Sequence, residues 1–383
     1  MKELHLPSPP NTLHNTAAEH IYRYIPYTTM AQNVPKSIKQ WTVSSMDGKD
    51  GFNALKLSEE PLPELGDSQV LVKLHAASLN YRDLSIPLGK YPFATVPNVV
   101  PGSDGAGTVV SVGKQVTRFK PGDKVVTLFN QAHLGGPLDA AAAASGLGGA
   151  IHGTLRTFGA FSEQGLVHMP SNISFEEAST LPCAALTAWN ALYGHSDNRV
   201  TAGQWVLTQG TGGVSIFALQ FAKAAGARVI ATTGSDNKVE TLRKLGADHI
   251  INYKTNPEWG AEAKKITGGH GVDHVVEVAG PKSMAQSLNA IKIAGVITII
   301  GFVGGFTKDQ PSFSDCLRHL CTVRGILVGA RTQMEDMCRA IEGNPDKLRP
   351  VVDKKTFKLE NLKEAYEYQW SGQHFGKVVV EIA

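Results

Sequence analysis

The sequence predicts an α/β protein of two domains, one built on a doubly wound parallel sheet and one smaller and rich in β-strands. Three observations lead to this prediction. A glycine cluster lies between an apolar strand and an apolar helix, apolar runs recur between helix-like segments, and the 383 residues exceed what one such sheet unit needs. The composition, 42% hydrophobic and 19% charged, is sufficient for two buried cores.

The glycine cluster lies between residues 205 and 233. Trp205 to Leu207 predict a strand, Ser215 to Ala225 a helix, and Val229 to Thr233 a second strand. Glycines at such a turn let backbone N–H groups approach a pyrophosphate at the positive end of the helix. A dinucleotide site is therefore expected, although a glycine cluster by itself is often an ordinary loop. The residues expected to cradle the pyrophosphate are Gly210, Gly212, Gly213, Val214 and Ser215, the last in place of the usual third glycine.

The apolar runs that follow the glycine cluster support the dinucleotide site. Continuous apolar segments are typical of parallel strands that crossover helices cover on both faces. Helix-like segments at 236–245 and 282–293 separate these runs. The runs are His249–Tyr253, His274–Val278, Val296–Gly301 and Val323–Val328.

The end of the second strand indicates which dinucleotide binds. An enzyme for NAD usually has an Asp or Glu there to hold the ribose 2′-hydroxyl, whereas this strand ends in Thr232–Ser235. A 2′-phosphate would accept a hydrogen bond from Ser235 and a charge-assisted one from Lys238. The sequence therefore favours NADP(H), with a solvated surface lysine as the alternative interpretation of Lys238.

The smaller domain is expected before the glycine cluster. Val70–Ala76, Gly105–Val112 and Asp123–Leu128 have the pattern of short strands separated by turns, which suggests a barrel-like domain. Gly135–Ala150 is expected to be a loop or a short helix without chemistry. A final strand at Lys377–Ile382 is expected to return to this domain. The expected divisions are an extension at 1–36, the β-rich domain at 37–171, the dinucleotide domain at 172–331, and the return at 332–383.

The extension at 1–36 is polar and rich in proline, so we expect it to be disordered. Met30 is an alternative start, and an organelle-targeting peptide is a weaker alternative because Glu3 and Glu19 oppose the basic charge. The net charge of +3 comes without a long basic run, and no apolar stretch approaches the roughly 20 residues that cross a bilayer. We therefore expect neither nucleic acid nor membrane as a partner. Four cysteines without CxxC spacing indicate a reducing compartment, most simply the cytoplasm.

Several segments in sequence order resemble the medium-chain dehydrogenase/reductase superfamily over roughly residues 38–383. The superfamily has a GroES-like catalytic domain and a Rossmann domain and is usually a homodimer, and it includes zinc alcohol dehydrogenases, quinone oxidoreductases and enoyl reductases. The segments that carry the resemblance are Ala77–Asp83, Pro101–Val109, Lys120–Asp123, Cys183–Leu192, the glycine cluster, and His374–Val378.

The resemblance implies further site residues. Tyr253 corresponds to a residue that approaches the 2′-phosphate, while Gly376 and Lys377 are expected near the cofactor. The candidates for contact with a small-molecule substrate are Asn80, Tyr81 and Tyr91, and Tyr81 is either a proton donor or a packing aromatic. Asp83 and Asp123 are expected to hold turns. The nicotinamide side is expected to be lined by Thr187, Ala279, Gly301, Phe302 and Val303.

The positions of the superfamily's catalytic zinc ligands correspond here to Asn80, Ser103 and Cys183, with Asp104 in place of a glutamate. An amide and a neutral hydroxyl hold Zn²⁺ poorly, so we expect no metal, and Cys183 is interpreted as a small buried residue. There is also no cysteine before Cys183 to form the structural zinc loop.

Without zinc, a reaction that needs the metal to activate an alcohol is disfavoured. Hydride transfer to a quinone or an α,β-unsaturated carbonyl remains, because hydrogen-bond donors can stabilise the resulting oxyanion. The sequence therefore predicts an NADPH-dependent, zinc-independent oxidoreductase. A zinc alcohol dehydrogenase with displaced ligands and a nucleotide-binding protein without turnover remain as alternatives.

Overall fold

The computed structural model describes residues 34–383. Most of the expected extension, with Met30, lies outside the described residues. Residues 34–36 lead directly into the first strand.

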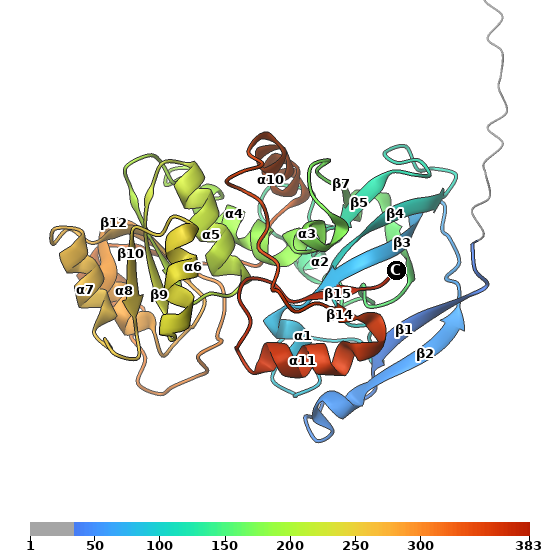
Figure 1. Cartoon of the computed structure of the whole chain (residues 1–383), viewed down its shortest axis with the longest axis horizontal. Helices are drawn as coiled ribbons and strands as arrows, with labels where there is room; N and C mark the ends of the chain where they lie inside the picture. Colours follow the sequence, from blue (N-terminus) through green and yellow to red (C-terminus); the bar gives the residue numbers. More distant parts are fainter. Residues whose placement is uncertain (1–33) are drawn as a thin grey trace, which may run out of the picture. The chain divides into compact units, whose positions relative to one another are not determined.

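Six parallel strands form the sheet of the Rossmann-like domain, in the order β10-β9-β8-β11-β12-β13 (Figure 1). The chain leaves β8 toward β9 on one side and later returns to β11 on the other, so the strand order reverses at β8. Ligands of such sheets bind beyond the carboxyl ends of the strands at this point. The strands are β8 (Trp205–Gln209), β9 (Arg228–Thr233), β10 (His249–Asn252), β11 (Val272–Glu277), β12 (Ile291–Ile299) and β13 (Thr322–Gly325).

Helices cover both faces of this sheet, as the continuous apolar runs predicted (Figure 1). Side chains alternate along β8, so Val206 packs against α4 and α5 while Leu207 packs against the α7 and α8 side. Both residues are completely buried. The helices of this domain are α4 (Leu186–Tyr193), α5 (Gly213–Ala224), α6 (Val239–Lys244), α7 (Trp259–Ile266), α8 (Met284–Ala290) and α9 (Asp315–His319).

Some predicted boundaries in this domain are wrong. The helix expected at 282–293 ends at Ala290, because Ile291 already pairs with Val272 of β11 in the sheet. The helix expected at 236–245 begins with a 3₁₀ turn at Asp236–Lys238. The last strand ends at Gly325 rather than at Val328, whose φ of 53° is incompatible with an extended strand.

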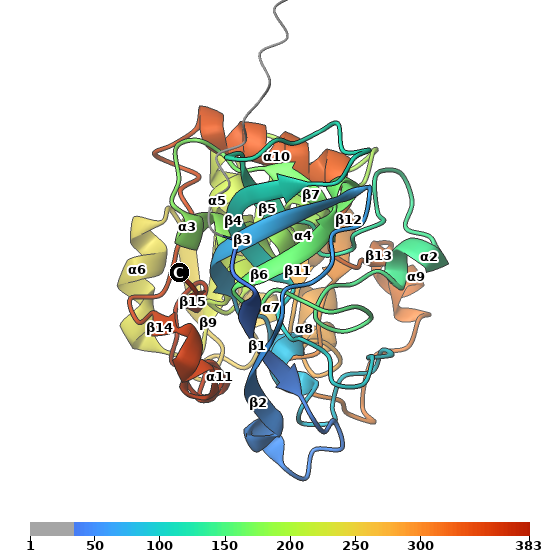
Figure 2. The same cartoon turned by 90° about the vertical axis from the view of Figure 1, so that its right-hand side faces the viewer.

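The GroES-like domain contains a seven-stranded sheet in which most neighbours are antiparallel (Figure 2). The strand β3 lies at its centre and pairs with β4, β6 and β15. A separate antiparallel pair consists of β1 (Ser37–Val43) and β2 (Leu55–Pro61). The strands of the large sheet are β3 (Gln69–Ser78), β4 (Asp104–Val112), β5 (Lys124–Thr127), β6 (Phe158–Ser162), β7 (Leu166–His168), β14 (Phe357–Lys358) and β15 (Val379–Glu381).

The expected turn residues are confirmed. The Asp83 carboxylate accepts a hydrogen bond from the Asn80 backbone N–H at 2.8 Å, and the Asp123 carboxylate accepts one from the Lys120 N–H at 2.9 Å. Within the segment 135–150, Ala140–Ala143 form the short helix α2, whose N-terminus the Asp139 side chain caps.

The end of the chain passes from one domain to the other. Helix α10 (Arg331–Gly343) buries Met334, Met337 and Ile341 in an apolar cluster that contains residues of both domains. The chain then forms α11 (Leu362–Trp370) and pairs β15 with β3. The final strand is shorter than Lys377–Ile382 because the Lys377 N–H donates to the Val351 carbonyl instead of joining the ladder.

Short helices complete the fold, and one of them has π geometry. This π-helix, Leu181–Ala185, runs directly into α4 and contains Cys183. Helices of this kind often lie at functional sites. Among residues 34–383, no helix combines the length and hydrophobicity that a membrane span requires. The remaining α-helices are α1 (Tyr81–Ser85) and α3 (Phe175–Ser179), and 3₁₀ turns occur at Gly51–Ala54, Glu163–Gly165 and Leu359–Asn361.

Candidate dinucleotide and substrate site

The three glycines between β8 and α5 have different physical reasons to be glycine. Gly210 has a φ of 73°, which favours glycine. A β-carbon on Gly213 would lie 2.4 Å from Cδ of Lys377, so packing requires its absence. Gly212 has an ordinary φ of −76°, and an added β-carbon would meet no protein atom within 4 Å. The open space at Gly212, at the N-terminus of α5, fits a pyrophosphate that approaches the backbone.

The residues that follow the glycines are turned inward. The Ser215 hydroxyl donates to the Gln209 carbonyl at 2.6 Å, which ties the first turn of α5 to the end of β8. Ser215 is buried and Val214 partly buried. Only their backbone N–H groups therefore remain for a phosphate, and the Ser215 side chain acts on the turn.

The three residues expected at the 2′-phosphate surround the end of β9. The Tyr253 hydroxyl lies over Gly234, where a β-carbon would come within 2.4 Å of it, and Ser235 is the next residue. Lys238 points toward the C-terminal segment, because its Nζ donates to the carbonyls of His374 at 2.8 Å and Gly372 at 3.2 Å. Burial lowers the pKa of Lys238.

Sequence reasoning missed a carboxylate next to the residues expected at the 2′-phosphate. Asp236 follows Ser235 directly, and its carboxylate accepts a hydrogen bond from the Asn252 side chain at 2.7 Å. That bond directs the carboxylate toward β10. The spacing of Asp236 from the glycines was a signal that could have found it.

The predicted nicotinamide residues lie on two connected loops at the ends of β11 and β12. The Gly304 N–H donates to the Ala279 carbonyl at 2.9 Å, and the Val303 N–H donates to the Val278 carbonyl at 3.3 Å. Gly301 and Phe302 belong to the second of these loops, and Thr187 is buried within α4.

A buried carboxylate that the sequence did not reveal shapes the first loop. Glu277 is completely buried at the end of β11, and it accepts hydrogen bonds from the Gln209 side chain at 2.6 Å and the Ser283 hydroxyl at 2.6 Å. The backbone N–H groups of Ala279 and Gly280 donate to it at 3.0 and 2.8 Å. These donors compensate the burial of its charge and fix the loop.

The expected substrate-contact residues lie in aromatic surroundings. The Tyr81 ring stacks on Trp370 with ring centroids 6.0 Å apart, and it meets the edge of Phe302 at 5.9 Å. Tyr81 therefore connects the end of α11 to the nicotinamide loop, and Trp370 is a neighbour that the sequence did not indicate. Tyr91 packs separately beside the Arg82 guanidinium, 5.1 Å from the ring centroid, and burial raises the pKa of its hydroxyl.

The positions that correspond to zinc ligands hold a polar set of a different kind. The Asn80 amide nitrogen donates to the Ser103 hydroxyl at 3.2 Å. The ammonium group of Lys377 donates to the Asn80 side-chain oxygen at 2.5 Å and to the Leu79 carbonyl at 2.6 Å. Burial and the nearby Asp104 carboxylate raise the pKa of the Cys183 thiol well above its usual range. The Lys377 ammonium group thus lies among the residues that correspond to the superfamily's zinc ligands.

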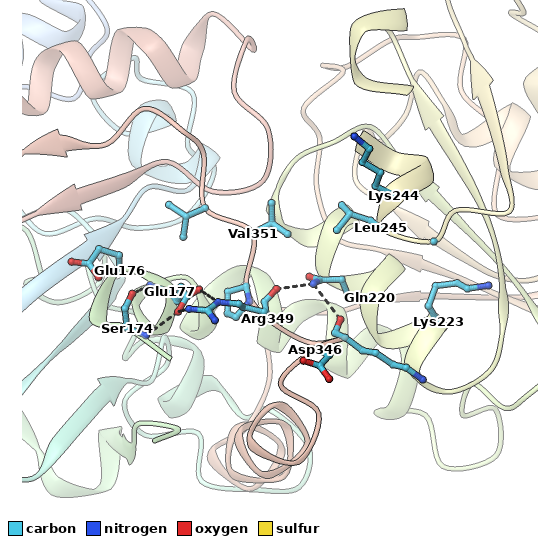
Figure 3. A pocket seen from close by; sticks show the side chains of 14 residues that line it. Ser174, Glu176, Glu177, Gln220, Lys223, Lys244, Leu245, Asp346, Arg349 and Val351 are labelled. Atoms are coloured by element: carbon cyan, nitrogen blue, oxygen red, sulfur yellow. Dashed lines mark hydrogen bonds and ion pairs between the residues drawn. The ribbon is translucent and has the colours of Figure 1, made fainter. Parts of the chain in front are cut away.

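A cavity of about 850 Å³ lies elsewhere, between α5, α6 and the segment 346–352 (Figure 3). None of the predicted site residues lines it. Arg349 donates to Glu177 at 2.5 Å, and its carbonyl accepts from the Gln220 amide at 2.7 Å. Lys223, also on the wall, pairs with Asp248 at 2.8 Å, and we assign the cavity no chemistry.

Comparisons with known proteins agree with this architecture. Residues 66–171 match the alcohol dehydrogenase GroES-like domain and residues 213–343 match the zinc-binding dehydrogenase domain. A zinc-type alcohol dehydrogenase-like protein of Schizosaccharomyces pombe is 48% identical over 88% of this chain and 97% of its own length. A chloroplastic quinone-oxidoreductase of Triphysaria versicolor is 35% identical over 88% and 96% of the two chains.

Two further similarities cover most of the chain. A 2-methylene-furan-3-one reductase of Solanum lycopersicum is 31% identical over 92% of this chain and 81% of its own. A crystal structure assigned to an alcohol dehydrogenase of Sinorhizobium meliloti superposes with a TM-score of 0.82 and 39% identity, over 91% of this chain and 99% of the other.

The fold and the site define an oxidoreductase with a dinucleotide-binding domain. The chain belongs to the medium-chain dehydrogenase/reductase superfamily.

The zinc in the family's description does not fit the residues present. A catalytic zinc needs three protein ligands of thiolate, imidazole or carboxylate type. Here an amide and a hydroxyl take two of the positions, so the Cys183 thiol is the one zinc-ligand type among the three. Throughout residues 34–383, no group of three or more His, Cys, Asp or Glu side chains is arranged to hold a metal ion.

Gly212→Ala tests the open space at the N-terminus of α5. We expect an unchanged melting temperature, because the new methyl group meets no protein atom and φ is ordinary. We expect the dinucleotide to bind about tenfold or more weakly, since the methyl group would occupy the space expected for the pyrophosphate. Calorimetric titration measures the affinity. Gly343→Ala, which also meets no atom within 4 Å, serves as the control, and equal affinity of both variants would refute the assignment.

Proposed function

We propose that this protein is an NADPH-dependent, zinc-independent reductase that transfers hydride to a quinone or an α,β-unsaturated carbonyl compound. The observation that carries the proposal is the polar set at the zinc position, where the Lys377 ammonium reaches Asn80. The similarity to a quinone-oxidoreductase and to a 2-methylene-furan-3-one reductase supports it. The compartment that we propose is the cytoplasm, which agrees with four free cysteine thiols.

The proposed reaction places negative charge on one oxygen atom. Bound NADPH would supply the hydride, which adds to the acceptor and leaves an enolate or a hydroquinone anion. Donors at Asn80 and Tyr81 stabilise this oxygen, and one proton completes the product. The Tyr81 hydroxyl is the candidate proton donor, because its ring is held between Trp370 and Phe302 beside the nicotinamide loop.

The preference for NADPH rests on the surroundings of Gly234. The Tyr253 hydroxyl lies over Gly234, Ser235 is the next residue, and the Lys238 ammonium group is held by two backbone carbonyls of the C-terminal segment. The carboxylate of Asp236 is directed to Asn252. The proposed site offers a 2′-phosphate hydrogen bonds from the hydroxyl groups of Ser235 and Tyr253 and a charge-assisted one from Lys238.

The decisive experiment follows NADPH oxidation by the purified protein with 1,4-naphthoquinone, trans-2-hexenal and crotonyl-CoA. Turnover that chelators leave intact, from protein without stoichiometric zinc by plasma emission spectrometry, is the expected result. One zinc per chain that is lost together with activity would favour an alcohol dehydrogenase instead. Tight NADPH binding without turnover of any acceptor would favour a nucleotide-binding protein.

Lys238→Ala should weaken NADPH binding by about tenfold to a hundredfold, because a charge-assisted hydrogen bond contributes about 1.5–3 kcal/mol. NADH binding should change little, since NADH has no 2′-phosphate. Both affinities are measured by calorimetry. Lys244→Ala, at the exposed end of α6, is the control. Wild-type protein that binds the two cofactors equally tightly would contradict the NADPH assignment.

Tyr81→Phe removes the hydroxyl group but keeps the ring that stacks on Trp370. If the hydroxyl donates the proton, kcat should fall by about 10²–10⁴-fold while NADPH affinity stays the same. The rate is measured where hydride transfer limits turnover. A variant that keeps more than about half of the wild-type kcat would show that Tyr81 only packs and that another donor supplies the proton.

We also propose that the protein is a homodimer, and that a second copy docks at β13. This strand is an edge of the parallel sheet, and an unpaired edge can pair with its own copy across a twofold axis. Large exposed apolar side chains gather in the adjoining segment 293–320, with Phe313 94% and Leu317 74% exposed. This apolar surface supports a protein partner.

Light scattering on Phe313→Asp with Leu317→Asp tests the homodimer. A charged side chain at each position would be buried without a partner, so the double variant should be monomeric at micromolar concentration. Leu57→Asp, a comparable change on the exposed side of β2, should leave the dimer intact. A wild-type protein that is already monomeric would reject the proposal.

A further inference from the structure

Four buried side chains near the Rossmann domain form a closed ring of hydrogen bonds. Lys377 donates to Asn80 at 2.5 Å, Asn80 donates to Ser103 at 3.2 Å, and Ser103 donates to Asp104 at 2.8 Å. Lys377 and Asp104 close the ring with an ion pair at 3.4 Å. Exposure is 9% for Asn80 and 3% or less for the other three residues. We call this group the Asn80 ring.

The chemistry of the members fixes the direction of each bond. A lysine ammonium only donates and an ionised aspartate only accepts. Lys377 must therefore face the oxygen of the Asn80 amide, which turns the amide nitrogen toward Ser103. The Ser103 hydroxyl gives its single proton to Asp104, so it must accept from Asn80. A flipped Asn80 amide would place donor against donor at Lys377.

This fixed orientation leaves one donor in the ring uncommitted. The Asn80 amide nitrogen has two protons, and Ser103 accepts one of them. The other has no acceptor in the ring. Asn80 directly precedes Tyr81, whose ring contacts Phe302 of the nicotinamide loop. The stem of Lys377 packs under Gly213 of the glycine cluster, so the ring lies between the cofactor site and the substrate residues.

We propose that Lys377 is a positioning residue that, with Asp104 and Ser103, holds the Asn80 amide so that its second N–H donates to the carbonyl oxygen of the acceptor. This inference rests on the proposed reductase function. It assigns Lys377 a role other than the contact with the cofactor that the resemblance implies. The fixed donor needs no reorganisation when charge develops on the oxygen, which is where such groups are most effective.

The variants Ser103→Ala and Ser78→Ala distinguish the orientation of the Asn80 amide from a general effect on Asp104. Ser103 and Ser78 are both completely buried beside the Asp104 carboxylate. The Ser103 hydroxyl donates to this carboxylate at 2.8 Å, whereas the Ser78 hydroxyl lies 2.9 Å from it and 3.0 Å from a second acceptor, the Ser179 carbonyl. Only Ser103 accepts from Asn80. Single-turnover reduction of trans-2-hexenal by bound NADPH should slow by about tenfold or more in Ser103→Ala. In Ser78→Ala it should stay within about threefold of the wild-type rate.

Lys377→Met distinguishes positioning from cofactor binding. The apolar stem that packs on Gly213 is kept, while the ammonium group that orients Asn80 is removed. Hydride transfer should fall by about 10²-fold at saturating NADPH, and the dissociation constant of NADPH should change by less than about threefold. A dissociation constant weakened by about tenfold or more, with the transfer rate preserved, would show instead that Lys377 binds the cofactor and would overturn the inference.

A measurement independent of turnover tests the ring even if the proposed function fails. In protein with ¹⁵N-labelled asparagine, the side-chain amide signals of Asn80 are those lost in Asn80→Asp. Their proton exchange should accelerate by about tenfold or more in Ser103→Ala and remain unchanged in Ser78→Ala. Equal changes of the exchange rate in the two serine variants would show that Ser103 does not orient the Asn80 amide and would overturn the inference. A wild-type protein that does not reduce trans-2-hexenal but shows this pattern would refute the donation to substrate and retain the orientation of the Asn80 amide by Ser103.

Discussion

The buried ammonium group of Lys377 is the interaction on which the site depends. It comes from the C-terminal segment, passes under the glycine cluster, and ends among groups of α1 and β4. An uncompensated buried charge costs several kcal/mol. Here the cost is offset by the Asp104 carboxylate and two further oxygen acceptors. Because these acceptors belong to separate segments, the cation fixes the C-terminal segment, the start of α1 and the dinucleotide loop in one arrangement.

The contacts of Lys377 depend on the return of the chain to the GroES-like domain after the parallel sheet. The pairing of β15 with β3 continues to the hydrogen bond from the Leu79 N–H to the Val378 carbonyl, so the adjacent Lys377 lies beside the N-terminus of α1 and its ammonium group reaches the Leu79 carbonyl. At that N-terminus Asp83 accepts the Asn80 N–H, and burial raises the pKa of Asp83 to about 6. Asn80 is thus held through its backbone by Asp83 and through its side chain by Lys377. The Gly376 N–H also donates to the Thr211 carbonyl. The segment that holds Asn80 through Lys377 therefore also holds the glycine-rich loop.

Local sequence was sufficient for elements whose pattern reflects local physics. The apolar runs predicted the strands because both faces of a parallel sheet are buried, and the preference of aspartate for turns predicted the roles of Asp83 and Asp123. Boundaries were less predictable. Ile291 leaves its helix because a ladder partner on β11 is available, and Lys377 leaves the last strand because its backbone N–H meets Val351. Such competitors are distant in sequence, so no local pattern contains them.

The sequence by itself determined the two-domain architecture, the glycine-rich turn between strand and helix, and the residue types at the positions of the family's zinc ligands, because residue type and local spacing carry this information. Only the tertiary structure decided which side chains those residues contact. Asn80, Ser103 and Lys377 are up to 297 residues apart, and their contact arises from the return of the final strand. The tertiary structure also distinguished Gly212, beside open space, from Gly213, packed on Lys377, although both are glycine in one short loop. Neighbours from distant segments give a residue its role, and only folding brings those neighbours together.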